Sequence, residues 1–205
     1  MMRPMQDPQK RINEILDAAE QLFFEKGYDR TTVKDIAKVM GVAQGTMYYY
    51  FKSKEEVLKG VIDRKADLVL SEMHRIALQP VDGWAKLSEM LSSLLQIAAT
   101  DNGNMMALMY RDNVVPYTMK ILDDISKHMD QELSLFIGSK GSGKDIEVDS
   151  PECALFFVKE LANSLANALL DTMTPIEWSR RLAMGECLIA TTLGGAPGQI
   201  KINMV

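Results

Sequence analysis

The stretch from Thr31 to Lys54 constrains the fold of this chain more than any other part of its sequence. It contains two short segments with helical periodicity on either side of a tight turn. Thr32 is placed to cap the first segment, and Asp35, three residues later, completes a capping box. Gly41 ends that segment as a residue free to adopt a positive φ. A helix, a turn of roughly three to four residues and a second helix form the pattern of a DNA-reading helix-turn-helix.

The second segment, Gln44 to Phe51, is unusual for a purely structural helix. Gly45 costs about 1 kcal/mol relative to alanine inside a helix, and close approach to a DNA backbone is one reason to tolerate it. Successive helical positions point about 100° apart, so three consecutive tyrosines cannot all be buried. Tyr48 and Tyr49 are predicted to face outward, where hydroxyls suit phosphate oxygens. The alternative is a plain helical hairpin with a solvated second helix, but the joint fit of cap, turn and spacing favours DNA reading.

From Ile12 to about Leu58 the chain resembles the TetR-type (tetracycline-repressor) family of transcriptional regulators. The matching pieces are Ile15 to Phe23, Lys26-Gly27-Tyr28, Thr31-Thr32-Val33, Asp35-Ile36-Ala37, Gly41-Val42, Gly45-Thr46, Tyr48-Tyr49, Phe51 and Lys52 to Glu55. Two positions depart from the family pattern: Ala43 stands where a capping Ser or Thr is usual, and Tyr50 replaces a frequent His. The resemblance implies a repressor that binds a palindromic operator as a homodimer and releases it when a small apolar or amphipathic effector binds.

The resemblance also assigns roles within the helix-turn-helix. Tyr49 and Lys54 match phosphate-contacting positions of the family, whereas Gln44 and Tyr48 match positions that touch bases. The predicted DNA-binding residues are Thr32, Gln44, Gly45, Thr46, Tyr48, Tyr49, Lys52 and Lys54.

The remainder of the chain reads as helical, which makes the predicted fold class all-α with about nine helices. Residues 1–52 are predicted to form the DNA-binding domain, and residues 53–205 a helical domain for effector binding and dimerisation. A long helix from Ser53 to Pro80 is interpreted as the connection between them. The last two long helices, at 150–172 and 174–193, are the predicted dimer interface. Its predicted residues are Ala154, Phe157, Leu161, Leu165, Leu169, Leu182 and Ile189.

Charge is distributed unevenly along the chain, whose formal net charge is −5. Residues 1–65 hold 12 Lys and Arg against 10 Asp and Glu, a net +2, so the other 140 residues hold 11 against 18, a net −7. The mild positive field therefore belongs to the helix-turn-helix end, which suits DNA as a partner. No apolar run of about 18 residues and no secretory signal are visible. Cys153 and Cys187 are interpreted as buried small side chains, and the expected location is the cytoplasm.

A small-molecule pocket is expected in the second domain. Its candidate lining residues are Trp84, Leu87, Met90, Met105, Met106, Met109, Tyr110 and Phe157. Methionine is flexible and polarizable, which suits varied apolar ligands, although the same residues can simply fill a core.

Two other functions remain open from the sequence. One is a DNA-bound structural or interaction protein without an effector, and the other is an enzyme with a DNA-binding appendage. The enzyme alternative is weak, because the two histidines stand alone in helical patterns and no catalytic, metal-ligating or cofactor-binding motif is recognised. Gly138 to Lys144 has the GxxxxGK spacing of a phosphate-binding loop, but Asp145 follows it instead of Ser or Thr, so a flexible linker is expected there.

Overall fold

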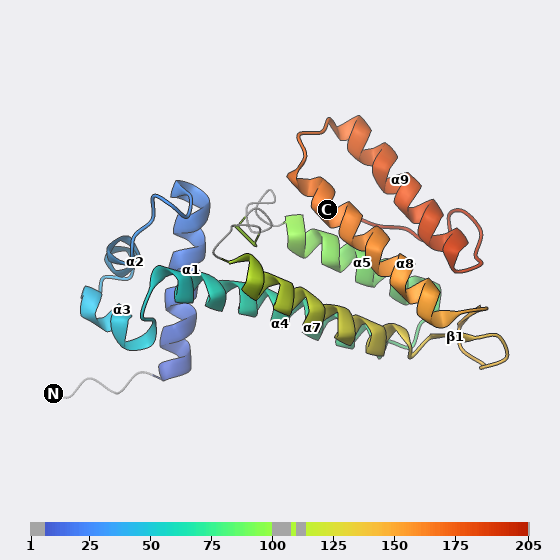
Figure 1. Ribbon diagram of the computed structural model, residues 1–205, viewed down its shortest axis with the longest axis horizontal. Helices are drawn as coiled ribbons and strands as arrows, with labels where there is room; N and C mark the ends of the chain where they lie inside the picture. Colours follow the sequence, from blue (N-terminus) through green and yellow to red (C-terminus); the bar gives the residue numbers. More distant parts are fainter. Residues whose placement is uncertain (1–6, 100–107, 110–113, 205) are drawn as a thin grey trace. The chain divides into compact units, whose positions relative to one another are not determined.

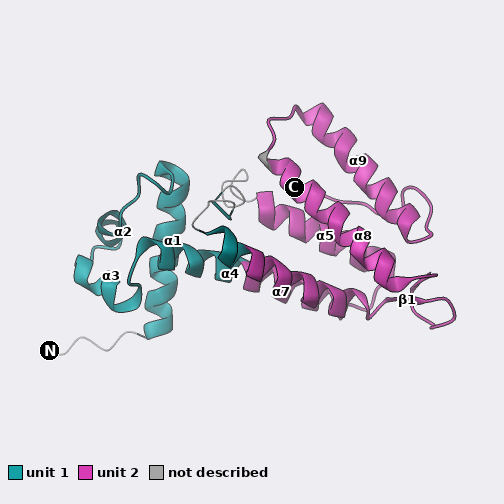
Figure 2. Ribbon diagram, in the orientation of Figure 1, with its two compact units in different colours: residues 1–65, 108–118 teal, residues 66–107, 119–205 magenta. Residues whose placement is uncertain are grey.

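The structure is a computed structural model that describes residues 7–99, 108–109 and 114–204. The chain forms two compact units, one of Met1–Lys65 with Leu108–Thr118, the other of Ala66–Ala107 with Met119–Val205 (Figures 1 and 2). Helices α4 (Lys54–Ala77) and α7 (Val115–Leu133) each run from one unit into the other. The second domain was predicted to start at residue 53, one residue before α4 begins, whereas the first unit extends along α4 to Lys65.

The first unit contains α1 (Pro8–Lys26), α2 (Val33–Val39) and α3 (Gln44–Tyr50) ahead of α4. Their apolar faces meet in one core, in which the largest fully buried side chains are Ile15, Ile36, Met47, Leu58 and Ile62. The helix-turn-helix expected from the sequence is therefore present as α2 and α3.

Local capping sets the boundaries of these short helices. The Thr32 hydroxyl accepts from the Asp35 amide at 3.2 Å, and the Asp35 carboxylate accepts from the Thr32 amide at 2.9 Å, so the predicted capping box is confirmed. Ala43 provides no side-chain cap to α3. The Thr46 amide in the first turn of α3 donates instead to the backbone carbonyl of Ala43, at 2.9 Å.

The first turn of α7 belongs to the first unit. The Tyr117 hydroxyl donates to the Asp63 carboxylate on α4, and the Lys59 ammonium lies 5.0 Å from the centre of the Tyr117 ring. Val114 and Thr118, on either side, are buried. Burial, together with the hydrogen bond to Asp63, raises the pKa of Tyr117 well above its ordinary value, so the phenol stays protonated.

The second unit is built from α5 (Gly83–Ala99), α8 (Pro151–Asn167) and α9 (Pro175–Thr192) together with the rest of α4 and α7. Helix α8 packs against both α5 and α9, and a short 3₁₀ helix (Ala168–Leu170) follows it (Figure 1). The all-α prediction is confirmed, with eight α-helices within the described residues. In the described part of the chain, no helix combines the length and the apolarity needed to cross a membrane.

Two strands of three residues each were not expected from the sequence. β1 (Ile137–Ser139) and β2 (Ile146–Val148) pair in parallel, with Ile137 opposite Ile146. Strands this short show too little alternation to be predicted. Residues 140–145 connect the two strands, and Gly138 and Ser139 of the expected flexible linker belong to β1.

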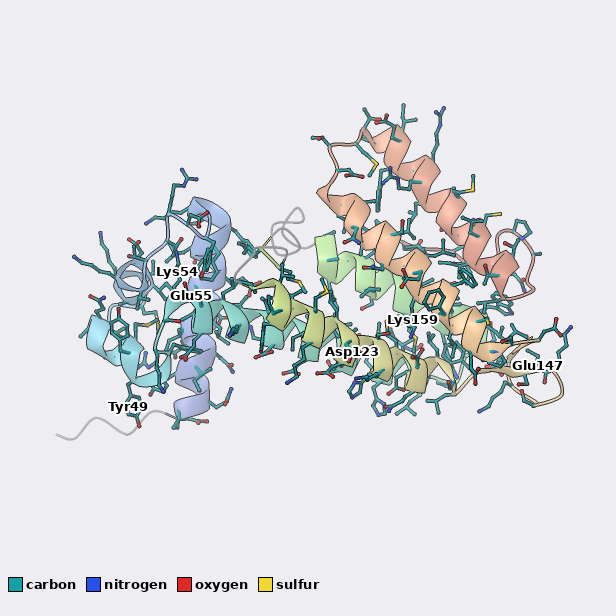
Figure 3. All side chains as sticks on the ribbon, in the orientation of Figure 1. Tyr49, Lys54, Glu55, Asp123, Glu147 and Lys159 are labelled. Carbon is teal, nitrogen blue, oxygen red and sulfur yellow. The ribbon has the colours of Figure 1, made fainter. Side chains whose placement is uncertain are left out.

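The carboxylate of Glu147 fills the glycine-rich loop. It accepts from the backbone amides of Gly141 at 2.9 Å and Gly143 at 2.7 Å (Glu147 is labelled in Figure 3). These hydrogen bonds hold the pKa of Glu147 below its ordinary value. The amides that would cradle a phosphate are thus already paired within the chain, which argues against a nucleotide site.

Candidate functional site

The exposed face of α3 is the candidate DNA-reading surface. Gln44 and Tyr48 lie one turn apart, and the side-chain nitrogen Nε2 of Gln44 is 3.4 Å from the Tyr48 hydroxyl. Tyr49 is 82% exposed and packs edge-on against Tyr50 (Figure 3). Met47, which precedes Tyr48 in the sequence, is fully buried and fixes the rotation of α3. Amide and phenol groups therefore face solvent on one helix, where base edges and phosphates can be reached.

Gly45 is not required by the packing of the protein itself. A Cβ atom built at this position meets nothing within 4 Å, and Gly45 adopts a helical conformation. The penalty of glycine in a helix thus has no compensation inside the chain. A partner that approaches the start of α3 closely would explain it.

Lys54 has a structural role that the sequence analysis missed. Its ammonium donates to the backbone carbonyl of Tyr28 at 2.9 Å and lies 4.1 Å from the centre of the Tyr28 ring. Lys54 therefore ties the α1–α2 loop to the start of α4 (Figure 3). An ammonium has three donors, so a phosphate contact remains open to it. The two residues are 26 positions apart, and no local signal in the sequence connects them.

The other predicted DNA-binding residues lie on the same unit. Thr32 is exposed and its hydroxyl is engaged in the capping box of α2. Thr46 is partly buried on α3, and Lys52 is exposed in the loop between α3 and α4.

The capping box also makes the stability of the first unit dependent on pH. Hydrogen bonds from the Thr32 hydroxyl and amide, with a smaller contribution from Lys26, lower the pKa of Asp35 from 3.8 to about 2. A depressed pKa stabilises the fold fully above the ordinary value, and this stabilisation is lost as the pH falls toward 2. We expect the urea midpoint of unfolding to decrease as the pH is lowered from about 4 to about 2. Asp35→Asn should weaken this dependence of the midpoint on pH, and it should also lower the midpoint at pH 7. Equal slopes in both proteins would contradict this role.

Part of the predicted effector pocket surrounds a real cavity in the second unit. Leu87 and Met90 line a cavity of about 10 Å³, close to the room needed by one water molecule. The cavity is completed by residues that sequence reasoning did not identify, among them Met73, Met129 and Glu132.

The remaining predicted pocket residues do not line this cavity. Trp84 packs against the core near Gly195, and Phe157 is 54% exposed on α8. Met109 is partly buried and belongs to the first unit. Met105, Met106 and Tyr110 lie outside the described residues.

The predicted dimer residues separate into two groups. Ala154, Leu165 and Ile189 are buried in the protomer's own core, so their side chains are not offered to a partner. Leu161, Leu169 and Leu182 are partly buried, whereas Phe157 is exposed.

Other apolar side chains on α8 and α9 face solvent and were missed. They are Phe156 on α8 and Ile176, Met184 and Leu188 on α9, exposed by between 43% and 66%. Helical periodicity marks apolar positions but does not say which face packs within the protomer and which faces solvent. Cys153 is also exposed, so the prediction that it is buried is wrong; Cys187 is partly buried.

The two histidines have partners that account for them. His74 Nδ1 lies 2.8 Å from a carboxylate oxygen of Glu132, and His128 Nδ1 lies 2.8 Å from the Asp124 carbonyl oxygen one turn before it. Both side chains are exposed. Their positions agree with surface histidines rather than catalytic bases.

Comparison with known proteins identifies the first unit independently. Residues 15–61 match the family described as "Bacterial regulatory proteins, tetR family". The chain is 32% identical over 98 residues to the fatty acid metabolism regulator protein of Bacillus subtilis (48% of this chain, 50% of that protein). It is 31% identical over 104 residues to the transcriptional repressor KstR2 of Rhodococcus jostii (51% and 50%). The matches thus span about half the length of these curated relatives.

Solved structures extend the likeness of the fold to nearly the whole chain. The fatty acid degradation regulator FadR from Bacillus halodurans superposes with a TM-score of 0.67 at 22% identity, over 93% of this chain and 97% of that one. A TetR-family regulator from Mesorhizobium loti gives 0.68 at 16% identity, over 93% and 98%. The relatives are transcriptional regulators rather than enzymes. With its helix-turn-helix of α2 and α3, its capping box and its all-α body, this chain belongs to the TetR family of bacterial transcriptional regulators.

Proposed function

We propose that this protein is a repressor that binds a palindromic operator as a homodimer and is released from DNA by a small effector held in the second unit. The observation that carries the proposal is the exposed face of α3, with Gln44 and Tyr48 adjacent at its start and Gly45 open to close approach. A single short helix reads too few base pairs for useful specificity, so two half-sites and a two-fold dimer are required.

The exposed apolar side chains of α8 and α9 support the dimer. Large apolar side chains exposed close together are typical of protein–protein interaction sites. Two neighbouring helices that each carry them, doubled by a two-fold axis, would make a four-helix contact. Repression rather than activation is supported by the resemblance and by relatives named as repressors.

A DNA-bound interaction protein without an effector is the alternative. Calorimetry on the purified protein identifies candidate small molecules that bind it. Operator titrations with and without such a molecule then separate the two functions, because only the ligand-responsive regulator changes its operator affinity. The operator itself is to be sought by footprinting on DNA that flanks the gene.

The test of DNA reading compares Gln44 with Lys52. Gln44→Ala is expected to cost about 1–3 kcal/mol on the operator and to blur the preference at one base pair in each half-site. Lys52→Ala should weaken operator and scrambled DNA by similar factors and lower the salt slope by about one unit per head. Lys52 is the better control, because Lys54 also holds Tyr28 in the folded chain.

Binding isotherms at several salt concentrations, on operator and scrambled DNA, decide the matter. Both side chains are exposed, so both variants should fold as the parent protein does. If Lys52→Ala changed base preference while Gln44→Ala left it intact, the placement of α3 in the groove would be wrong.

A further inference from the structure

A short extended segment lies between α5 and α9 in the second unit. The chain turns back after α9 (Figure 1), and residues 200–203, here called the docked segment, follow the turn. Ile200 and Ile202 are 0% and 5% exposed and belong to the main core cluster of this unit. Lys201 and Asn203 face solvent. This alternation is that of an extended strand, but the backbone amides of the segment donate to side chains of two helices.

Two serines one turn apart on α5 accept hydrogen bonds from the backbone of the docked segment. The Lys201 amide donates to Ser88 Oγ at 3.2 Å. The Asn203 amide donates to Ser92 Oγ at 3.0 Å. Each hydroxyl also donates to a carbonyl of its own helix, Ser88 to Trp84 at 2.8 Å and Ser92 to Ser88 at 2.7 Å. Because a hydroxyl has a single hydrogen, both serines are held with their lone pairs toward the segment.

The spacing of these acceptors matches the spacing of an extended backbone. Four residues of helix rise about 6.0 Å, and two residues of strand rise about 6.6–6.8 Å. Gln96, one turn further along α5, continues the row, because its side-chain nitrogen donates to the Asn203 carbonyl at 2.7 Å. On the opposite edge of the segment, the Ile202 amide donates to the Glu186 carboxylate of α9 at 2.7 Å. Successive peptide groups are therefore contacted from both sides.

We propose that α5 and α9 form a recognition site for an extended peptide with isoleucine at alternate positions, which the docked segment occupies as a reversible internal ligand. In such recognition, main-chain hydrogen bonds give affinity and the burial of alternate side chains gives specificity. The segment follows a turn with glycines at positive φ, Gly194 and Gly198, and its amides are held by side chains, so it leaves without the unfolding of a helix. The partner that fits this site is a protein segment of the same pattern, which binds by displacing residues 200–203.

Amide hydrogen exchange on the full-length protein tests whether the docked segment is reversible. If it leaves while the fold remains, the amides of Lys201 and Asn203 should exchange roughly tenfold or more faster than those of Leu91 and Leu95, which are buried on α5. Exchange as slow as that of these α5 amides would mean that the segment leaves only when the whole unit unfolds, and the proposal would be overturned.

Calorimetric titration with a synthetic peptide of residues 198–204, with both ends blocked, tests recognition. In the parent protein the docked segment competes with the peptide from a millimolar effective concentration. Lys201→Pro removes the amide that donates to Ser88 and keeps both isoleucines, so this variant should bind the peptide roughly tenfold more tightly than the parent does. Lys201→Ala is the matched control, because it keeps the amide and changes only an exposed side chain, and it should bind the peptide as the parent does.

Two further titrations test specificity. A peptide carrying Ile200→Ser and Ile202→Ser should bind the Lys201→Pro protein roughly tenfold to a hundredfold more weakly than the unchanged peptide. Adding Ser88→Ala and Ser92→Ala to that protein removes the acceptors on α5 and should abolish the gain in binding. Equal binding of the two peptides, or of one peptide to Lys201→Pro and Lys201→Ala, would overturn the proposal, as would no binding by any peptide. If Lys201→Pro does not fold, the exchange rates of the parent protein decide.

Discussion

Replacing Phe157 and Met184 together by glutamate is expected to convert the proposed dimer to a monomer and to lower operator affinity by roughly a hundredfold or more. Both side chains face solvent on the helices assigned to the interface, 54% and 60% exposed, so the protomer loses no core contact. In the dimer they would be buried, and two-fold symmetry would place four new carboxylates in one apolar contact. A monomer holds one half-site, and its affinity falls toward the non-specific range.

Leu135→Glu is the matched control, because Leu135 is 49% exposed but lies in the segment between α7 and β1 and not on α8 or α9. It should remain a dimer with the operator affinity of the parent protein. Light scattering at micromolar concentration and operator titrations measure both effects. If the double variant stayed dimeric, the interface would not be formed by these side chains of α8 and α9. If it were a monomer with full operator affinity, the proposal that the protein reads two half-sites would be contradicted.

Gly45→Leu is expected to produce opposite effects on folding and on DNA binding. In the free protein nothing lies within 4 Å of a Cβ at this position, so the change stabilises α3 by up to about 1 kcal/mol. On the operator the added side chain is expected to clash with the DNA backbone that we propose approaches Gly45 closely. We therefore expect operator affinity to fall by roughly tenfold to a hundredfold, the usual cost of overpacking. Urea unfolding and operator titration of one preparation give both values.

Gly41→Ala provides the contrast within the same helix-turn-helix. Gly41 has φ of 66°, so alanine there is strained by about 1–2 kcal/mol even though space is open around it. This variant should lose stability where Gly45→Leu gains it. If Gly45→Leu instead bound the operator normally, the glycine would have no part in DNA approach and the reading surface would lie elsewhere on the unit.

Features determined by neighbours in the chain were predictable from the sequence. The capping boxes of Thr32 with Asp35 and of Thr174 with Glu177 are both present, and α9 begins at Pro175 as its N1 proline predicts. These interactions span three residues, so the residue types alone specify them.

Contacts between distant residues were not predictable in this way. Lys54 with Tyr28 and His74 with Glu132 are separated by 26 and 58 positions. The same holds for the C-terminal segment, whose amides at Lys201 and Asn203 donate to Ser88 and Ser92 on α5. Only the packed fold brings these groups together.

The buried Val114 and the Tyr117–Asp63 hydrogen bond make the DNA-binding unit discontinuous in the sequence. A fragment cut after residue 65 would end in the middle of α4 and would lack the segment that covers this part of the unit. A chimera that exchanges operator specificity with a relative therefore needs two grafts, the N-terminal residues and the short stretch around 114–118. A single recombination crossover between residues 65 and 114 would place parts from two different family members in one DNA-binding unit. Such a hybrid would be selected against.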